Sequence, residues 1–292
     1  MDSILTGARP QSEYKIAYRA PGESGSTWNL ATPIGAERQG QSVLLLKGGT
    51  EDFDAQPALT KRATVNGFGE RAIAANLPSF GSSIKVLIGK HGIDLREADR
   101  AWRQAWQLVI HNGELPNFDP FDPTLSGRFI ISETGGRNLW LPVYATEMSS
   151  LDANYRGRRT LESTITWESL AGTYFGSKIT KEGTFVLTVP GDTYPAARLR
   201  WDTSQSGYVA MPNGQSLTLE PGPGTSGIRY INLERGYAGQ VTREDGTVDT
   251  EVWSQLRGAV LGIHLTPHEE INWAMTIGLS LEVVPRHLSP WR

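Results

Sequence analysis

The residue types that could bind a metal ion gather in one short stretch near the end of the chain, which contains His264, His268, Glu269 and Glu270. Two histidines four residues apart share one face of a helix and recur in zinc sites. Pro267 lies between these histidines, however, and the flanking residues are typical of a strand that ends in a turn. The zinc-protease order His-Glu-x-x-His is absent. We therefore expect a polar turn here and no metal site.

Three aspartates, Asp119, Asp122 and Asp152, could supply the paired carboxylates that hydrolyse a glycosidic bond. Asp119 and Asp122 lie in a loop with three prolines, where Asp-Pro sequences are typical of turns. The chain has no Gly-x-Ser-x-Gly sequence for a serine nucleophile. It also has no cysteine, which excludes disulfides, thiolate zinc sites and cysteine nucleophiles. We predict no catalytic residue, no metal ligand and no cofactor site, and hence a protein that is not an enzyme.

A glycine-rich stretch, Pro221–Gly227, has the composition of a phosphate-binding loop but not its sequence. It lacks the Gly-Lys-Ser/Thr ending, no helix follows it, and its two prolines remove amides that such a loop uses. A flexible turn is the better interpretation.

Two groups of residues permit more than one interpretation. The basic run Arg156, Arg158 and Arg159 could contact an acidic neighbouring subunit, or it could be the solvated tip of a hairpin. Four tryptophans in the second half could form a sugar-stacking surface or could pack between sheets; they are Trp201, Trp253, Trp273 and Trp291.

Composition favours a strand-rich protein of one large or two ordinary domains. The chain has 292 residues, 38% of them hydrophobic, with 32 glycines and 17 prolines for tight turns. The net charge of −3 gives no electrostatic reason to expect nucleic acid as a partner. The start of the chain lacks the pattern of a signal peptide. The longest aliphatic run, residues 43–46, is too short for membrane insertion.

One helix is predicted among the strands of the first half, over Leu95–Val109. Its apolar residues, Trp102 and Trp106 among them, fall on one stripe, which predicts a helix that covers a sheet. Asp94 is a suitable N-cap, and Glu97 completes a capping box. Strands are expected around it, at 14–18, 28–30, 43–46, 71–77, 84–88, 127–133, 139–148 and 158–170, with a glycine-rich loop at 61–69. In the last of these strands, Leu161, Ser163, Ile165 and Trp167 share one face.

The second half alternates short strands with Gly, Pro, Asp and Asn turns. Strands are expected at 184–189, 197–203, 207–211, 216–220, 228–233, 239–243, 247–253, 259–265 and 274–283. This density of turns is typical of a sandwich of the jelly-roll or galectin type. We therefore predict a mainly β protein with two β-sandwich domains. The first spans residues 1–180 with the covering helix at 95–109, and the second spans 181–292.

Five features in this order resemble the distal tail proteins and related minor tail proteins of siphophages, especially phages of actinobacteria. They are "TWNL" at 27–30, the helix with paired tryptophans, the long strand 158–170, the aromatic cluster Tyr174-Phe175-Gly176, and the ending "GQVTREDGTVDTEVWSQLRGAVLGIHLTP" with "IGLSLEVVPRHLSPWR". Residues 35–82 depart from the commonest pattern of that family.

The resemblance implies a structural protein of the virion tail tip, made in the host cytoplasm, with no cofactor. Its N-terminal sandwich forms a homo-oligomeric ring, most often a hexamer, which joins the tail tube to the tip or baseplate complex. The implied partners are the tail tube protein, the tape measure protein and the tail hub protein, while the second sandwich is peripheral. An alternative is a carbohydrate-binding or receptor-binding tail module that contacts a host surface glycan through aromatic side chains exposed on one face. A glycan-degrading tail enzyme instead predicts a cleft with two carboxylates about 5–9 Å apart.

Overall fold

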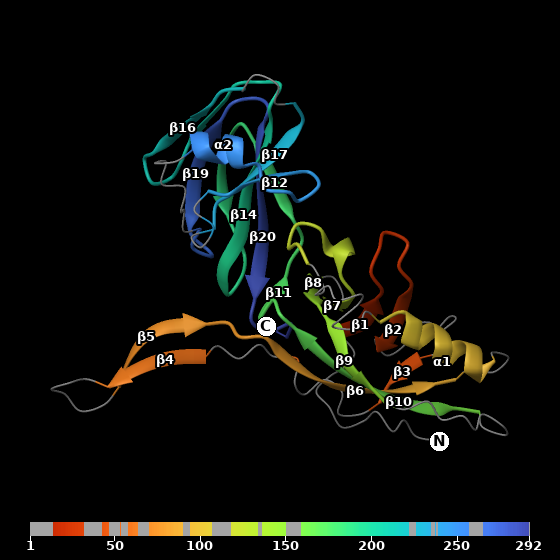
Figure 1. Ribbon diagram of the computed structural model, residues 1–292. Helices are drawn as coiled ribbons and strands as arrows, with labels where there is room; N and C mark the ends of the chain where they lie inside the picture. Colours follow the sequence, from red (N-terminus) through yellow and green to blue (C-terminus); the bar gives the residue numbers. More distant parts are fainter. Residues whose placement is uncertain are drawn as a thin grey trace. The chain divides into compact units, whose positions relative to one another are not determined.

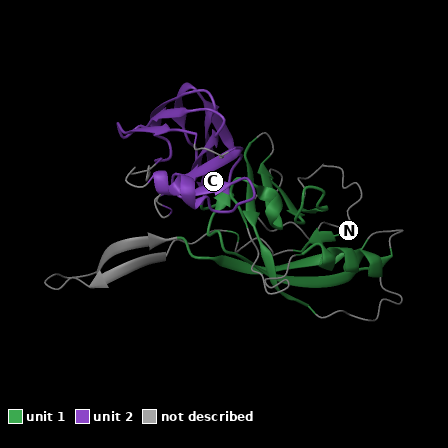
Figure 2. Cartoon of the chain, turned by 45° about the horizontal axis from the view of Figure 1, so that its top comes forward, with its two compact units in different colours: residues 1–174, 288–292 green, residues 175–287 purple. Residues whose placement is uncertain are grey.

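The computed structural model describes residues 14–31, 43–46, 53, 58–63, 70–89, 94–106, 118–133, 136–149, 159–221, 226–234, 237, 239–256 and 265–291. The chain divides into two compact units (Figure 2). Unit 1 comprises Met1–Tyr174 with Leu288–Arg292, and unit 2 comprises Phe175–His287. Each unit is built mainly from antiparallel strands (Figure 1), so the prediction of a mainly β protein with two sandwiches is confirmed. The finer galectin-like assignment of the second sandwich stays a prediction.

Two sheets form the sandwich of unit 1. The first has the order β8-β7-β1-β2 and contains β1 (Tyr14–Arg19), β2 (Thr27–Ala31), β7 (Arg128–Glu133) and β8 (Asn138–Pro142). The second has the order β3-β6-β10-β9 and contains β3 (Val43–Leu45), β6 (Phe80–Ile88), β9 (Tyr144–Met148) and β10 (Leu161–Ser169). The predicted alternation of β10 is confirmed, because Leu161, Ser163, Ile165 and Trp167 are all buried. Phe129 of the first sheet meets Trp167 of the second, with ring centroids 5.2 Å apart.

The strand predicted over 139–148 is in fact two strands, β8 and β9, which belong to different sheets. Pro142 ends β8 and cannot donate a backbone hydrogen bond. The amide of Val143 then donates to the carbonyl of Gly127 at 2.8 Å. The chain therefore changes sheets at Val143, a buried residue whose two neighbouring strands face one common core.

Helix α1 (Leu95–Gln104) begins where the sequence predicts and ends before Val109, the predicted end. Asp94 caps it by accepting a hydrogen bond from the Arg96 amide at 2.9 Å. The carbonyl of Ala105, the C-cap residue, accepts a hydrogen bond from the Tyr18 hydroxyl at 2.8 Å. In a longer helix, the Ala105 carbonyl would instead accept a hydrogen bond from a helix amide four residues further on. Residues 107–117 lie outside the described part of the chain.

The tryptophan stripe of α1 packs in the core of unit 1, as predicted. Trp102 and Trp106 are both buried, and their rings meet edge to face with centroids 5.5 Å apart. Trp106 follows the helix rather than lying within it. Both indoles belong to one aromatic cluster with Tyr18, Trp28 and Phe129.

Unit 1 also contains a 3-10 helix, the first residue of the short strand β11, and a separate pair of strands, β4 and β5, which we call the arm. The turn before β7 includes a 3-10 helix, η1 (Pro123–Leu125). Strands β4 (Ala58–Ala63) and β5 (Glu70–Asn76) pair with each other as a two-stranded sheet (Figure 1). The loop predicted at 61–69 is therefore partly strand, because β4 reaches Ala63, and its remaining residues 64–69 lie outside the described part. Strand β11 (Tyr174–Phe175) contains the boundary between the units.

The predicted division into 1–180 and 181–292 differs from the observed one at both ends of the second unit. Unit 2 begins at Phe175, so it includes β12 (Ile179–Glu182), which the sequence pattern did not reveal as a strand. The last five residues, Leu288–Arg292, belong to unit 1. There the ring of Trp291 meets the ring of Tyr14 edge to face at 5.1 Å, and the Tyr14 hydroxyl donates to the Trp291 carbonyl at 3.4 Å.

Unit 2 is a second sandwich. Its first sheet has the order β18-β17-β14-β20 and contains β14 (Thr193–Asp202), β17 (Ile228–Asn232), β18 (Val241–Arg243) and β20 (Leu279–His287). Strand β12 also pairs with β20. Its second sheet has the order β13-β19-β15-β16 and contains β13 (Thr184–Thr188), β15 (Gly207–Ala210), β16 (Ser216–Leu219) and β19 (Glu270–Met275). Trp201 of the first sheet and Trp273 of the second share one buried core.

Two strand predictions for unit 2 are wrong. Residues 250–253 of the strand predicted at 247–253 belong instead to a helix, α2 (Thr250–Gln255). Asp249 caps this helix by accepting a hydrogen bond from the Val252 amide at 3.1 Å. The single strand predicted over 274–283 is broken between β19 and β20 by a turn at 276–278, where Gly278 has a φ of 91°. The strand predicted at 259–265 lies, except for Leu265, outside the described residues.

Candidate interaction surfaces

The residues with metal-ligand chemistry do not assemble a site in the described part of the chain. No group of three or more His, Asp and Glu residues there could hold a metal ion. His268 adopts a left-handed φ of 64° and its amide donates to the Val189 carbonyl at 2.9 Å, as expected in a turn. Glu269 and Glu270 are exposed beside it, and His264 lies outside the described residues.

The two described aspartates with possible catalytic chemistry are used in turns. Asp119 accepts a hydrogen bond from the Phe121 amide at 2.8 Å. Asp122 caps η1 by accepting from the Thr124 amide at 2.9 Å and the Thr124 hydroxyl at 2.6 Å. These contacts match the predicted turn chemistry. Asp152 lies outside the described residues.

Two further candidate stretches are described only in part. In the glycine-rich stretch, residues 222–225 lie outside the described part. In the basic run, Arg159 is exposed, whereas Arg156 and Arg158 are among the residues that the structure does not describe. Both interpretations of that run therefore stay predictions. No helix in the described residues is both long and apolar enough to cross a membrane.

The four tryptophans of the second half do not all belong to one exposed surface. Trp201 is 1% exposed and Trp273 is 2% exposed in the core of unit 2. Trp253 packs against the same core, and Trp291 packs in unit 1. The sugar-stacking interpretation is therefore wrong for Trp201 and Trp273, whose packing between sheets is confirmed. Both interpretations stay predictions for Trp253 and Trp291, which are partly buried.

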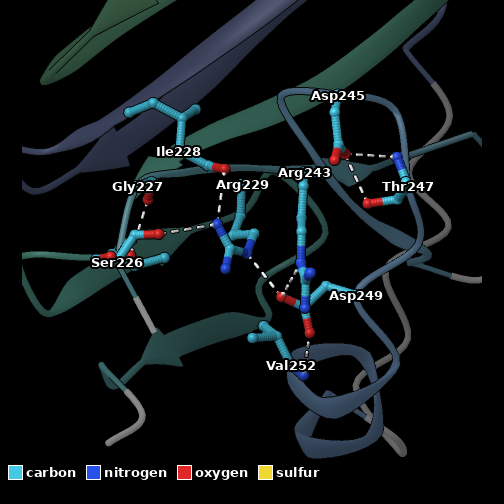
Figure 3. A network of polar contacts seen from close by, with 10 residues as sticks. Ser226, Gly227, Ile228, Arg229, Arg243, Asp245, Thr247, Asp249 and Val252 are labelled. Atoms are coloured by element: carbon cyan, nitrogen blue, oxygen red, sulfur yellow. Dashed lines mark hydrogen bonds and ion pairs between the residues drawn. The ribbon is translucent and has the colours of Figure 1, made fainter. Parts of the chain in front are cut away.

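A partly buried ionic cluster links the start of α2 to two strands of the first sheet of unit 2 (Figure 3). Arg229 of β17 and Arg243 of β18 lie opposite each other, and both direct their Nε atoms at Asp249 Oδ2, at 2.7 and 3.3 Å. Burial alone would raise the pKa of Asp249, but hydrogen bonds from the Val252 amide and the two guanidinium groups outweigh it and hold that pKa below its usual value. Every oxygen of the carboxylate is thus engaged, so the cluster is structural.

The outward side chains of the first sheet of unit 2 also form ion pairs between strands. Glu282 of β20 is buried and accepts from Arg198 Nε of β14 at 2.7 Å and from Lys178 Nζ at 3.4 Å. The Arg198 guanidinium lies 3.8 Å from the centre of the Tyr230 ring. Two cations therefore share one carboxylate on this face.

The outward face of the other sheet is different, because it carries almost no charge. Its side chains are Thr184, Val186, Thr188, Tyr208, Ala210, Ser216, Thr218, Asn272 and Ala274, with Glu270 at one end. We call this set, without Glu270, the neutral face. Val186 is 56% exposed and Tyr208 is 43% exposed. Val186 and Tyr208 lie on different strands, separated by β19, and single exposed apolar side chains are ordinary on a protein surface.

Strand β13 forms an open edge of this sheet, with no strand paired beyond it in the described part of the chain. The Met275 amide of the next strand bonds the carbonyl of Gly183, which directly precedes β13. Hydrogen-bonded positions alternate along an antiparallel pair, so the amides and carbonyls of Thr184, Val186 and Thr188 point away from β19. No charge or proline guards these groups, which makes β13 a site for pairing with another strand.

Sequence reasoning found β13 as a strand but not as an edge. Its alternation of Thr184, Val186 and Thr188 with Phe185 and Leu187 was visible in the sequence. The position of β13 at the end of a sheet, however, depends on partners far along the chain. The arm β4–β5 is a second structure of this kind, because neither strand pairs with a further strand in the described residues.

Comparisons with known proteins point to one kind of fold. No protein-family model matches the chain, and no curated protein matches its sequence. Among solved structures, the crystal structure of the SPP1 Dit (gp 19.1) protein, described as a paradigm of the hub adsorption apparatus in phages that infect Gram-positive bacteria, has a TM-score of 0.54 at 11% identity. The match covers 93% of this chain and 98% of that chain. The P2 baseplate in its activated conformation with Ca has a TM-score of 0.49 at 6% identity, with the same shares covered. At 11% identity, the likeness to SPP1 Dit concerns the fold.

Proposed function

We propose that this chain is a structural protein of a bacteriophage tail tip that forms a ring between the tail tube and the tip or baseplate complex. The observation that carries the proposal is the fold similarity to SPP1 Dit, which spans 93% of this chain and therefore reaches into both units. A shared sandwich alone would be weak support, since sandwiches serve many functions. A match across two successive units and almost the whole of the other chain is more specific.

Assembly is supported by a two-stranded sheet that pairs with no further strand in the described part of the chain. An isolated two-stranded sheet is marginally stable in water, and the arm β4–β5 has no further strand in the described residues. A head-to-tail contact between subunits would cover such an arm, and closed rotation of that contact makes a ring. The number of six and the partners, which are the tail tube, tape measure and tail hub proteins, follow from the family resemblance.

A structural rather than catalytic role is supported by how the acidic groups are used. Asp119, Asp122 and Asp249 accept hydrogen bonds from the backbone of the turns or helix that they cap. A carboxylate that is committed to local backbone amides is poorly placed to act on a substrate. This arrangement disfavours the glycan-degrading interpretation.

A carbohydrate-binding or receptor-binding tail module is the second candidate, and one observation favours it. Tyr208 is exposed on the neutral face, directly opposite Thr218 and hydrogen-bonded through its backbone to Thr276. An aromatic ring beside hydroxyl groups suits a neutral sugar. If this candidate is correct, Tyr208→Ala abolishes binding to a host-wall glycan, whereas Tyr194→Ala, at another exposed tyrosine, preserves it.

Native mass spectrometry tests the ring proposal. The purified protein is measured alone and after mixing with the tail tube protein, because some tail proteins assemble only on their partners. We expect a closed oligomer, of six chains, in at least the second sample. A chain that stays single in both samples contradicts the proposal.

A further inference from the structure

Two arginines lie directly opposite each other in the first sheet of unit 1. Arg19 ends β1, Arg128 begins β7, and the antiparallel register pairs them. Like charges at directly opposed positions of a sheet are destabilising. The pairing of Arg19 with Arg128 therefore needs a compensating interaction.

Within the described residues, both guanidinium groups bond only neutral acceptors. Arg19 Nη2 donates to the Glu23 carbonyl at 2.7 Å. Arg128 Nη1 donates to the carbonyls of Pro123 and Ser126. No carboxylate of the described part forms an ion pair with either arginine. The Nε of Arg19 is buried and has no hydrogen-bond partner.

The environment of Arg128 increases the cost of this arrangement. Arg128 is 4% exposed, and burial, followed by the charge of Arg19, lowers its pKa. Asp122 acts in the opposite direction but does not reach ion-pair distance, since its carboxylate is bonded by Thr124. Glu23 is exposed and contacts Arg19 through its carbonyl. Buried charges are ordinarily paired, so a buried and a partly buried cation that have no close anion among the described residues call for an explanation.

The surrounding turns hold both arginines in place without any ligand. The Gly22 amide donates to the Thr124 carbonyl at 2.8 Å, which ties the turn after β1 to η1. The Ala20 amide donates to the Ser26 carbonyl at 3.0 Å and closes that turn. A Cβ on Gly25 would lie 2.2 Å from the Ala20 carbonyl oxygen, so only glycine fits there. Two positioned guanidinium groups are preorganised for an anion.

We propose that Arg19 and Arg128 together bind one oxyanion, and that in the assembled protein this group is an acidic side chain of a second copy of the chain. The second statement rests on the proposed ring. Guanidinium donors match the planar oxygens of a carboxylate, and inorganic sulfate or phosphate offers the same chemistry. The chain carries 31 acidic against 28 basic residues, so a second copy has carboxylates to offer.

Thermal unfolding of the full-length protein tests the anion site. Sodium sulfate is compared with sodium chloride at equal ionic strength, which separates specific binding from charge screening. The extra rise in Tm with sulfate is measured for wild type, Arg19→Gln and the control Lys15→Gln. Lys15 is an exposed cation on the same face of the same strand. The control also accounts for the general stabilisation that sulfate gives to folded proteins.

We expect wild type and Lys15→Gln to gain roughly 1–3 °C more in sulfate than Arg19→Gln does. Equal gains in all three proteins overturn the site. Native mass spectrometry then identifies the source of the anion. A lower oligomer fraction for Arg19→Gln, and for wild type in sulfate, supports a carboxylate of a second copy. Normal assembly of Arg19→Gln overturns that source while the anion site stands. If sulfate gives the expected extra rise in Tm but the protein never assembles, the proposed ring is contradicted and the anion site stands.

Discussion

The ring of Trp106 stacks on the ring of Tyr18, with centroids 4.0 Å apart and planes 7° from parallel. The hydroxyl of the same tyrosine donates to the carbonyl of Ala105, at the end of α1. One side chain of β1 therefore both covers the second tryptophan of the stripe and marks the point at which the helix stops.

Replacing Trp106 by alanine should lower the free energy of unfolding by about 3–5 kcal/mol, because it removes a large buried ring. Tyr18→Phe keeps the stacked ring and removes only the hydrogen bond, so its cost should be about 0.5–1.5 kcal/mol. Urea denaturation of the full chain measures both. Equal losses for the two variants would show that the stacking contributes little.

Asp249 should make the stability of the protein sensitive to acid. Its pKa is depressed in the folded state, so its contribution is present above the unfolded pKa, about 3.9, and is lost as pH falls through the folded pKa. At neutral pH, Asp249→Asn should cost about 3–5 kcal/mol, because it leaves Arg229 buried beside an uncharged group. Calorimetry should show the gap between wild type and variant narrowing below about pH 4. A gap that stays constant there would contradict the assigned role.

The fold was most predictable where a pattern was long and local. The alternation of β10 and the tryptophan stripe of α1 follow directly from periods of two and 3.6 residues. A strand is predicted at 247–253 because Val248, Thr250 and Val252 alternate with other residues. The signal that decides the structure is Asp249, which caps the helix α2. The end of α1 was missed because it depends on Tyr18, far away in the sequence.

The candidate surfaces were less predictable than the fold. The turn chemistry of Asp119 and Asp122 could be read from the neighbouring prolines. The opposition of Arg19 and Arg128, and the open edge of β13, could not, because both depend on which distant strands pair. The return of Leu288–Arg292 to unit 1 likewise depends on a contact with Tyr14 at the other end of the described chain.

A charge placed on β13 should suppress strand pairing between molecules. Val186→Lys should reduce concentration-dependent light scattering and change the free energy of unfolding by only about 0.5 kcal/mol, since the side chain is exposed. Asn272→Lys is the matched control, because Asn272 lies opposite Val186 on the neutral face but on an inner strand. If both variants lower scattering equally, added charge rather than the edge is responsible.

Unit 2 should fold by itself. Residues 175–287 contain both layers of their sandwich and a core that includes Trp201 and Trp273. The isolated fragment should melt cooperatively and should not hydrolyse host-wall polysaccharide. Turnover that is abolished by changing one carboxylate would make unit 2 an enzyme and would contradict the structural role.

Averaged cryo-electron micrographs of tails that carry this protein test the central claim most directly. The account predicts a closed ring of copies, six in number, at the junction of tail tube and tip, with unit 1 in the ring and unit 2 at its periphery. A single copy per tail, or a position away from that junction, would contradict it.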